Sequence, residues 1–225
     1  MIKLRTLASA DDISALVQDI GFLPFFKNEI QGFSIEECTP LELWFSADAD
    51  GPWEWKGPIA RAGKCVYGKF FRGKAGFISL DHFKNLANYR RDGYDYEGFY
   101  EDGHSLRKDK DAFDLISESG SVLSKLIKQK LNYRKGGNKG FDTVITRLQM
   151  QTFVCISDFE YMRDKYGNEY GWGVARYSTP ENLFGEGFMT ETYETEPEAS
   201  KRKIYKHLTK LLPDANEKQI LRLIG

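Results

Sequence analysis

The 225-residue sequence contains little cysteine and little histidine. Its three cysteines, Cys38, Cys65 and Cys155, are far apart and form no C-x-x-C pair, which argues against a disulfide framework and against a thiolate zinc site. The three histidines are isolated and match neither the H-E-x-x-H spacing nor a catalytic-triad pattern. We therefore predict a protein of a reducing compartment with no metal site and no cofactor.

The sequence also lacks long apolar runs and net charge. No stretch approaches the roughly 18 apolar residues of a membrane span, and the start turns polar at Asp11 and Asp12 before an export signal could develop. This predicts a cytoplasmic protein without a membrane partner. Lys plus Arg number 32 against 33 Asp plus Glu, a net charge of −1, so any attraction to nucleic acid must be local.

Hydrophobic periodicity and turn residues divide the first half of the chain into short elements. We expect a C-terminal stop for the first helix at Gly21 and an N-terminal cap for the second at Ser34. The pattern predicts a helix over 9–20, a helix from 34 to 45 that Pro40 can interrupt, a loop over 48–52, two strands within 64–79, a helix over 81–91 and a surface loop or string of turns over 89–104.

The second half predicts three helices followed by a two-stranded ribbon. The helices cover 106–117, 121–131 and 141–150, with a glycine loop at 136–140, and the strands cover 152–161 and 170–177. This is the order of a winged helix, whose third helix enters the DNA major groove. Two further helices are expected over 199–212 and 213–224.

The predicted fold class is therefore α+β. It consists of a winged-helix module at 105–180, with an N-terminal α/β extension at 1–104 and C-terminal helices at 181–225 that pack on the rest. No internal repeat and no Pro- or Ser-rich linker divides these parts.

Charge is distributed unevenly in this half. The segment from Ser121 to Arg147 contains seven Lys or Arg residues and one acidic residue, Asp142, so its net charge is +6. Residues 181–198 contain six glutamates and no Lys or Arg. A basic segment at this place in a winged helix would meet DNA phosphates. The cations that we predict to bind phosphate are Lys125, Lys128, Arg134, Lys135, Lys139 and Arg147.

Nearly the whole chain resembles the AlkZ-related proteins, relatives of the bacterial AlkZ-type winged-helix DNA glycosylases. The strings that carry the resemblance are Gly21-Phe22-Leu23-Pro24, Pro52-Trp53-Glu54-Trp55, Tyr67-Gly68-Lys69-Phe70-Phe71, Lys74-Ala75-Gly76-Phe77, Asn88-Tyr89-Arg90-Arg91-Asp92-Gly93-Tyr94, Tyr170-Gly171-Trp172-Gly173 and Tyr177-Ser178-Thr179-Pro180-Glu181.

Those glycosylases use a Gln-aliphatic-Gln or Gln-aliphatic-Asp motif to hold the water that attacks the glycosidic carbon. Gln149-Met150-Gln151 resembles this motif, which implies that Gln149 and Gln151 position water in the hydrolysis of a modified purine nucleoside. An amide can orient water beside a developing sugar cation without carrying a charge itself. The alternative is structural: Leu148 and Met150 belong to the core and the helix end, and the glutamines pair with backbone or solvent.

The sequence thus favours duplex DNA as the partner and leaves catalysis open. The alternative function is a non-catalytic winged-helix module, either a DNA-binding regulator or a protein-interaction domain. A second candidate site is the acidic stretch from Asp92 to Asp102, whose carboxylates could do acid–base work or hold a divalent ion. The alternative for that stretch is a solvated acidic surface.

Overall fold

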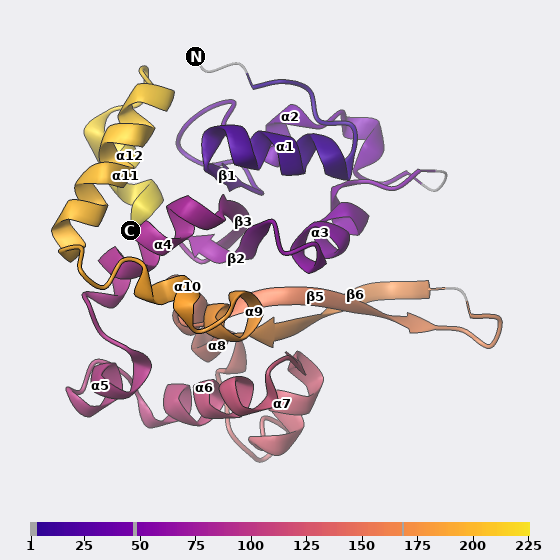
Figure 1. Cartoon of the computed structure of the whole chain (residues 1–225). Coiled ribbons are helices and arrows are strands. Elements are labelled where there is room, and N and C mark those ends of the chain that lie inside the picture. The colour runs from indigo at the N-terminus through magenta and orange to yellow at the C-terminus, as the bar shows by residue number, and fades with distance from the viewer. Residues whose placement is uncertain (1–3, 47–48, 168) are drawn as a thin grey trace.

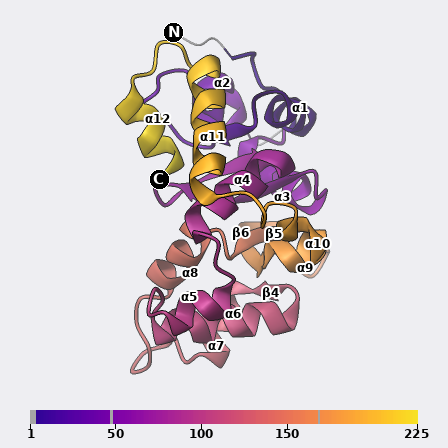
Figure 2. The same ribbon diagram turned by 60° about the vertical axis from the view of Figure 1, so that its left-hand side comes forward.

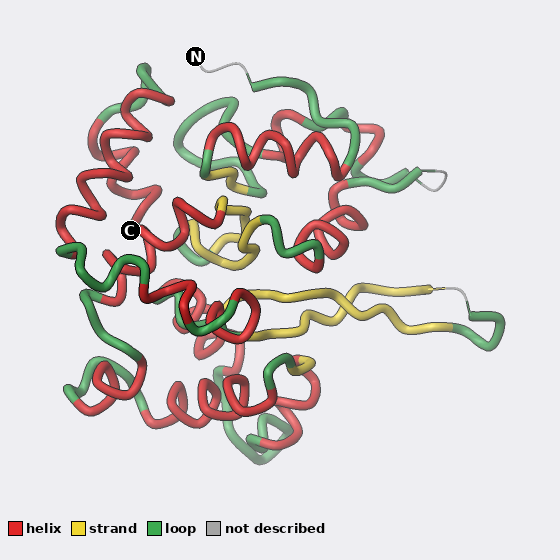
Figure 3. Tube along the Cα trace, viewed as in Figure 1, coloured by secondary structure: helices red, strands yellow, loops and turns green. Residues whose placement is uncertain are grey.

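The computed structural model describes residues 4–46, 49–167 and 169–225. The described strands form a six-stranded antiparallel sheet in the order β1-β3-β2-β5-β6-β4. Helices surround this sheet, and a long ribbon projects from it (Figure 3). This mixture of helices and antiparallel strands confirms the predicted α+β class. Within the described part of the chain, no helix combines the length and the apolar character needed to cross a bilayer.

The first half of the chain supplies strands β1 to β3 and helices α1 to α4 (Figure 1). Ser34 caps α2 as predicted and accepts a hydrogen bond from the N–H of Glu37. The helix predicted from 34 to 45 is wrong beyond Cys38, because Pro40 interrupts it and only a 3-10 turn follows. The elements are α1 Ala10–Ile20, β1 Phe22–Pro24, α2 Ile35–Cys38, a 3-10 helix Leu41–Leu43, α3 Pro52–Arg61, β2 Cys65–Phe71, β3 Lys74–Ser79 and α4 Leu80–Arg91.

Helix α3 was not expected from the sequence. The loop predicted over 48–52 begins at residue 48, which lies outside the described residues, and it ends where α3 begins at Pro52. Proline is well tolerated in the first helical turn, where its missing N–H would have no partner, and Glu54 accepts a hydrogen bond from the N–H of Gly51. The Gly-Pro pair therefore starts a helix here.

The second half contains two further differences from the prediction. The loop predicted over 89–104 instead contains the end of α4 and the short helix α5, because buried Tyr96 stacks on Phe113 with ring centres 3.8 Å apart. The helix predicted from Ser121 starts at Ser124, because Val122 and Leu123 form strand β4 on the edge of β6. The elements are α5 Tyr96–Glu101, α6 Arg107–Ser119, β4 Val122–Leu123, α7 Ser124–Lys130, α8 Phe141–Met150, β5 Cys155–Arg163 and β6 Glu169–Ser178.

The C-terminal elements pack on the first half. Asn88 of α4 donates from Nδ2 to the carbonyl of Thr195 and to Ser200 Oγ at the start of α11. The last helix begins after Asn216, which forms a capping box with Gln219, and not at 213 as predicted. The elements are α9 Pro180–Phe184, α10 Gly187–Thr190, α11 Pro197–Leu211 and α12 Glu217–Ile224.

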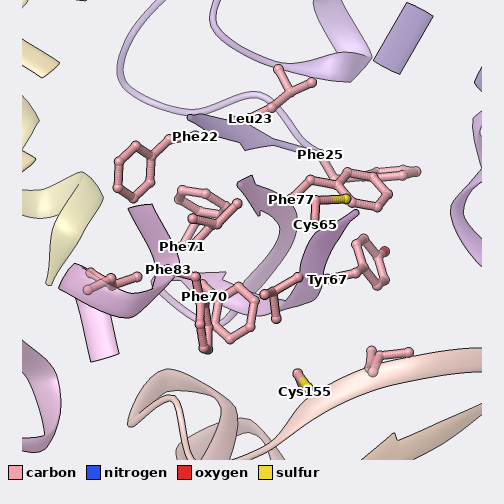
Figure 4. Packing of buried hydrophobic residues seen from close by; sticks show 14 of the residues in the cluster. Phe22, Leu23, Phe25, Cys65, Tyr67, Phe70, Phe71, Phe77, Phe83 and Cys155 are labelled. Carbon is pink, nitrogen blue, oxygen red and sulfur yellow. The ribbon is translucent and has the colours of Figure 1, made fainter. Parts of the chain in front are cut away.

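The sheet and the hydrophobic core run through the predicted boundary at 104/105. Strand β2 pairs with β5 at Tyr67 and Ile156, which joins the N-terminal strands to the ribbon. The aromatic side chains of β1 to β3 pack together above Cys155 of β5 (Figure 4). The predicted module at 105–180 is thus continuous with the rest of the molecule through both backbone pairing and core packing.

Candidate nucleic-acid interface

Helix α8 packs against α6 and β2 and leaves one side open to solvent. Its buried side includes Val144 and Ile145, whereas Asp142 and Thr143 are exposed. Thr146 is half-buried, and Lys69 of β2 donates from Nζ to its Oγ1 over 3.3 Å. The third helix of the predicted module therefore presents a narrow exposed side, bordered by a lysine from the N-terminal half.

The connection between α7 and α8 is a compact, folded-back loop. The N–H of Asn138 donates to the carbonyl of Asn132 over 2.7 Å. A Cβ on Gly137 would lie 2.1 Å from that same carbonyl oxygen, so only glycine fits this close approach. Lys135 and Lys139 lie exposed on this loop, directly before the first turn of α8.

Three other predicted phosphate-binding cations lie on α7 or at the start of the loop. Lys125 and Arg134 are exposed. Lys128 is half-buried, with Nζ 4.7 Å from the centre of the Phe141 ring, where the ammonium is attracted to the aromatic face. Five of the six predicted cations thus gather on α7 and the loop before α8.

Arg147, the sixth predicted cation, is used inside the molecule. Its guanidinium forms two hydrogen bonds, of 2.7 and 2.6 Å, to the carboxylate of Asp109, which is completely buried. These hydrogen bonds raise the pKa of Arg147 above its usual range. The pair fastens α6 to α8, so Arg147 is already bound to a buried carboxylate, although about a third of its side chain remains exposed.

The two glutamines of the predicted catalytic motif have different surroundings. Gln149 is completely buried, donates from Nε2 to the carbonyl of Ile145 over 3.0 Å and accepts from the N–H of Lys69 over 3.0 Å. The oxygen end of its amide thus connects α8 to β2, and the nitrogen end bonds within α8. Gln151 follows the end of α8, and its Oε1 is buried without a hydrogen-bond partner among the described residues.

Arg90 and Arg91 of α4 hold the turn that contains this motif. Arg90 donates to the carbonyl of Met150 and Arg91 to the carbonyl of Thr152, over 2.9 and 2.8 Å. Burial lowers the pKa of Arg90 to about 10. Both arginines thus fix backbone carbonyls on either side of Gln151.

The turn between β2 and β3 also contacts α8, which the sequence did not predict. The N–H of Gly73 donates to Met150 Sδ over 3.0 Å, and a Cβ on Gly73 would lie 3.3 Å from Thr146. Arg72 on this turn is exposed. The contact joins segments some 75 residues apart, so no local pattern could reveal it.

The acidic stretch from Asp92 to Asp102 has mainly structural contacts. Asp95 caps α5, Tyr94 donates to Asp102 over 2.8 Å, and Glu97 pairs with Lys110 over 2.8 Å. Within residues 4–46, 49–167 and 169–225, no group of three His, Cys, Asp or Glu side chains is arranged to hold a metal ion.

Comparison with known families agrees with the resemblance seen in the sequence. The profile of a family described as AlkZ related matches residues 7–225. The chain therefore belongs to the AlkZ-related family, which suggests a relation to DNA repair glycosylases. No curated protein and no solved structure matches the chain at a significant level.

Proposed function

We propose that this protein binds duplex DNA with the exposed side of α8 and the cations of α7 and the following loop. The order α6-β4-α7-α8-β5-β6, with β4 on the outer edge of β6, corresponds to the connectivity of a winged helix. In that module the third helix lies in the major groove and the ribbon forms the wing. Family membership supports the same partner.

The observation that carries the proposal is that cations border the exposed side of α8 at both ends. Lys135 and Lys139 precede its first turn, and Lys69 and Arg72 lie beside its second half. Lysine and arginine at such positions bind phosphates and release counterions, which fixes the register of the helix on the duplex. Thr143 and Thr146 are then the side chains that can reach base edges.

Fluorescence anisotropy of a labelled 20-base-pair duplex across a salt series tests this function. With about four to five phosphate contacts, log affinity should fall with log salt at a slope near −4. Lys135→Glu/Lys139→Glu should flatten that slope by about 2. The matched control is Lys203→Glu/Lys206→Glu, which makes the same charge change on exposed positions of α11. Absence of binding by the wild type at low salt would overturn the proposal.

A second candidate function, hydrolysis of the N-glycosidic bond of a modified purine, is favoured by the unpartnered Oε1 of Gln151. A buried acceptor without a donor costs about 1–3 kcal/mol, so its presence needs an explanation. Water held there would attack the sugar carbon while the carbon–nitrogen bond breaks, the base leaves with the bonding electrons, and the proton released by the water passes to solvent. Gln151, and not the fully engaged Gln149, would orient that water.

Abasic-site formation in alkylated duplex DNA tests this second function. Gln151→Ala should abolish base release while DNA affinity and thermal stability stay at wild-type levels. Unchanged base release in this variant would remove Gln151 from the mechanism. If the wild type binds DNA but releases no base, the non-catalytic alternative is the correct one, and a DNA-binding regulator becomes the function to study.

A further inference from the structure

A basic groove lies between the segment 27–30, the β2–β3 turn and α12. Its volume is about 530 Å³. It adjoins a second hollow of about 610 Å³ beside α12. Gln219 donates from Nε2 to the carbonyl of Glu29 over 2.7 Å, which holds α12 against the segment. The charged residues that line the two hollows are six cations and two carboxylates: Lys27, Arg72, Lys74, Lys201, Lys218, Arg222, Glu29 and Glu217.

Most of the positive charge in this groove is uncompensated. Arg72 and Arg222 share one carboxylate, Glu29, at 3.1 and 2.7 Å. The hydrogen bonds from Arg222 lower the pKa of Glu29, so this carboxylate is ionised at neutral pH. Of the other four cations, Lys201 pairs with Glu198 over 3.3 Å, whereas Lys27, Lys74 and Lys218 are exposed and form no ion pair with a described carboxylate.

The groove continues from the exposed side of α8. Arg72 lines it, and the next residue, Gly73, contacts Met150 and Thr146 of α8. Figure 2 shows α12 above α8 along the same edge of the molecule. A ligand that lies on α8 therefore meets the groove beyond the second half of that helix.

We propose that this groove binds the phosphodiester backbone of the duplex that lies on α8, so that the DNA contact extends from the loop before α8 to α12. The inference rests on the proposed DNA-binding function. A helix of ten residues, such as α8, is about 15 Å long, and the DNA major groove is about 12 Å wide. Cations beyond both ends of α8 are therefore spaced to contact the phosphates of both DNA strands. The cations of residues 125–139 lie at one end of α8 and would contact only one strand.

Neutralising the three unpaired lysines tests the groove without breaking an ion pair. Lys27→Gln/Lys74→Gln/Lys218→Gln should flatten the salt slope for the 20-base-pair duplex by about 2–3, because each phosphate contact contributes about 0.9. Replacement of the same three lysines by arginine should retain the wild-type slope. The matched control is Lys203→Gln/Lys206→Gln/Lys210→Gln, which changes three exposed lysines of α11 that line neither hollow.

The outcomes separate the two proposals. If the triple glutamine variant and the α11 control both keep the wild-type slope, the groove does not bind DNA, although the proposed function stands. If the wild type itself does not bind, both proposals are overturned. An equal loss of slope in the groove variant and the control would show that total charge, and not the groove, determines affinity, and would overturn the inference.

A substitution of Glu29 should change DNA affinity in the opposite direction, by strengthening it. Glu29→Gln removes the carboxylate that occupies Arg72 and Arg222, so both guanidinium groups become available to phosphate. DNA affinity at about 0.1 M salt should rise, by up to about eightfold for each new phosphate contact. Glu194→Gln, at an exposed position that lines neither hollow, is the matched control. Unchanged or weakened binding by Glu29→Gln would contradict the groove proposal.

Discussion

The basic segment 121–147 and the acidic segment 181–198 differ in how much of their charge is used inside the molecule. In the acidic segment, Glu181 pairs with Arg91 of α4 over 2.6 Å, and Glu191 pairs with a lysine of the same helix. A further glutamate pairs with a lysine of α11. Half of the six acidic side chains thus fasten the C-terminal part of the chain to itself or to its first half.

In the basic segment, by contrast, most of the charged side chains form no ion pair with another described residue. Lys125, Lys135 and Lys139 are exposed and pair with no described carboxylate, and Arg147 is the exception because of its bond to Asp109. Helices α9 and α10 lie on the side of the molecule away from α8 (Figure 2). The comparison shows that a net charge of −1 conceals a polarised surface, whose acidic side is partly structural and whose basic side remains available to a ligand.

The largest expected effect on stability comes from breaking the ion pair between Arg147 of the basic segment and Asp109. Arg147→Met leaves the carboxylate of Asp109 buried without a cation, which should lower the free energy of unfolding by about 3 kcal/mol. Arg134→Met, at an exposed position in the same segment, should change it by less than about 0.5 kcal/mol. Urea unfolding of both variants measures the difference. Equal stabilities would show that Arg147 is no more structural than the surface cations.

The two glutamines of the Gln149-Met150-Gln151 motif should differ in the same way. Gln149→Ala removes the acceptor of the Lys69 N–H and leaves a buried gap, so the free energy of unfolding should fall by about 2 kcal/mol. Gln151→Ala removes an acceptor that has no donor, and the desolvation cost that this relieves offsets the lost side-chain packing, so the free energy of unfolding should stay within about 0.5 kcal/mol of the wild type. Thermal and urea unfolding measure both. A larger loss in Gln151→Ala would contradict the assigned contacts.

Local patterns predicted the elements that local residues determine. The apolar spacing around Ile13 and the Ser9 cap define α1, and strand alternation defined the ribbon, because neighbours in sequence decide both. Strand β4 escaped prediction because its two residues become a strand only by pairing with Tyr177 and Arg176 of β6. Helix α5 escaped because stacking of Tyr96 on a distant ring, and not periodicity, stabilises it.

The candidate site shows the same limit more strongly. The cations at 125–139 were predictable because they follow one another along the chain. The role of Gln149 was not, since its partner Lys69 lies 80 residues away. The groove was also unpredictable, because residues near 27, 72 and 222 meet only when α12 packs on the first half. Sequence patterns thus identified the basic segment, but not the three-dimensional surface on which its cations and those of the groove lie.

A smaller effect is expected from the contact between α4 and α11, which belongs to neither charged segment. The rings of His82 and His207 lie 4.2 Å apart. Burial, together with the electrostatic interaction with the neighbouring His207 ring, lowers the pKa of His82 from 6.5 to about 4. The folded state therefore prefers the neutral ring, so this contribution to stability is present above about pH 6.5 and is lost as the pH falls toward 4.

The wild-type melting temperature should fall by about 3–5 °C more between pH 7 and pH 5 than that of His82→Gln. The exposed variant His104→Gln should follow the wild type. This comparison separates the histidine contact from protonation of the acidic segment, which all three proteins share. Identical pH dependence in the wild type and His82→Gln would assign the acid sensitivity to the carboxylates instead.

The smallest expected effect concerns the unpaired glutamates of the acidic segment. Glu186 and Glu196 are exposed and form no ion pair with a described cation, so Glu186→Gln/Glu196→Gln changes the surface charge without breaking a contact. Salt screens charges beyond about 10 Å at 0.1 M, and both glutamates lie outside α7, α8 and the loop between them. DNA affinity should therefore rise less than twofold at this salt concentration, against the much larger loss in Lys135→Glu/Lys139→Glu. Anisotropy titrations measure the DNA affinity of both variants. Affinity changes of similar size would mean that DNA binding depends on the total charge of the molecule and not on the cations around α8.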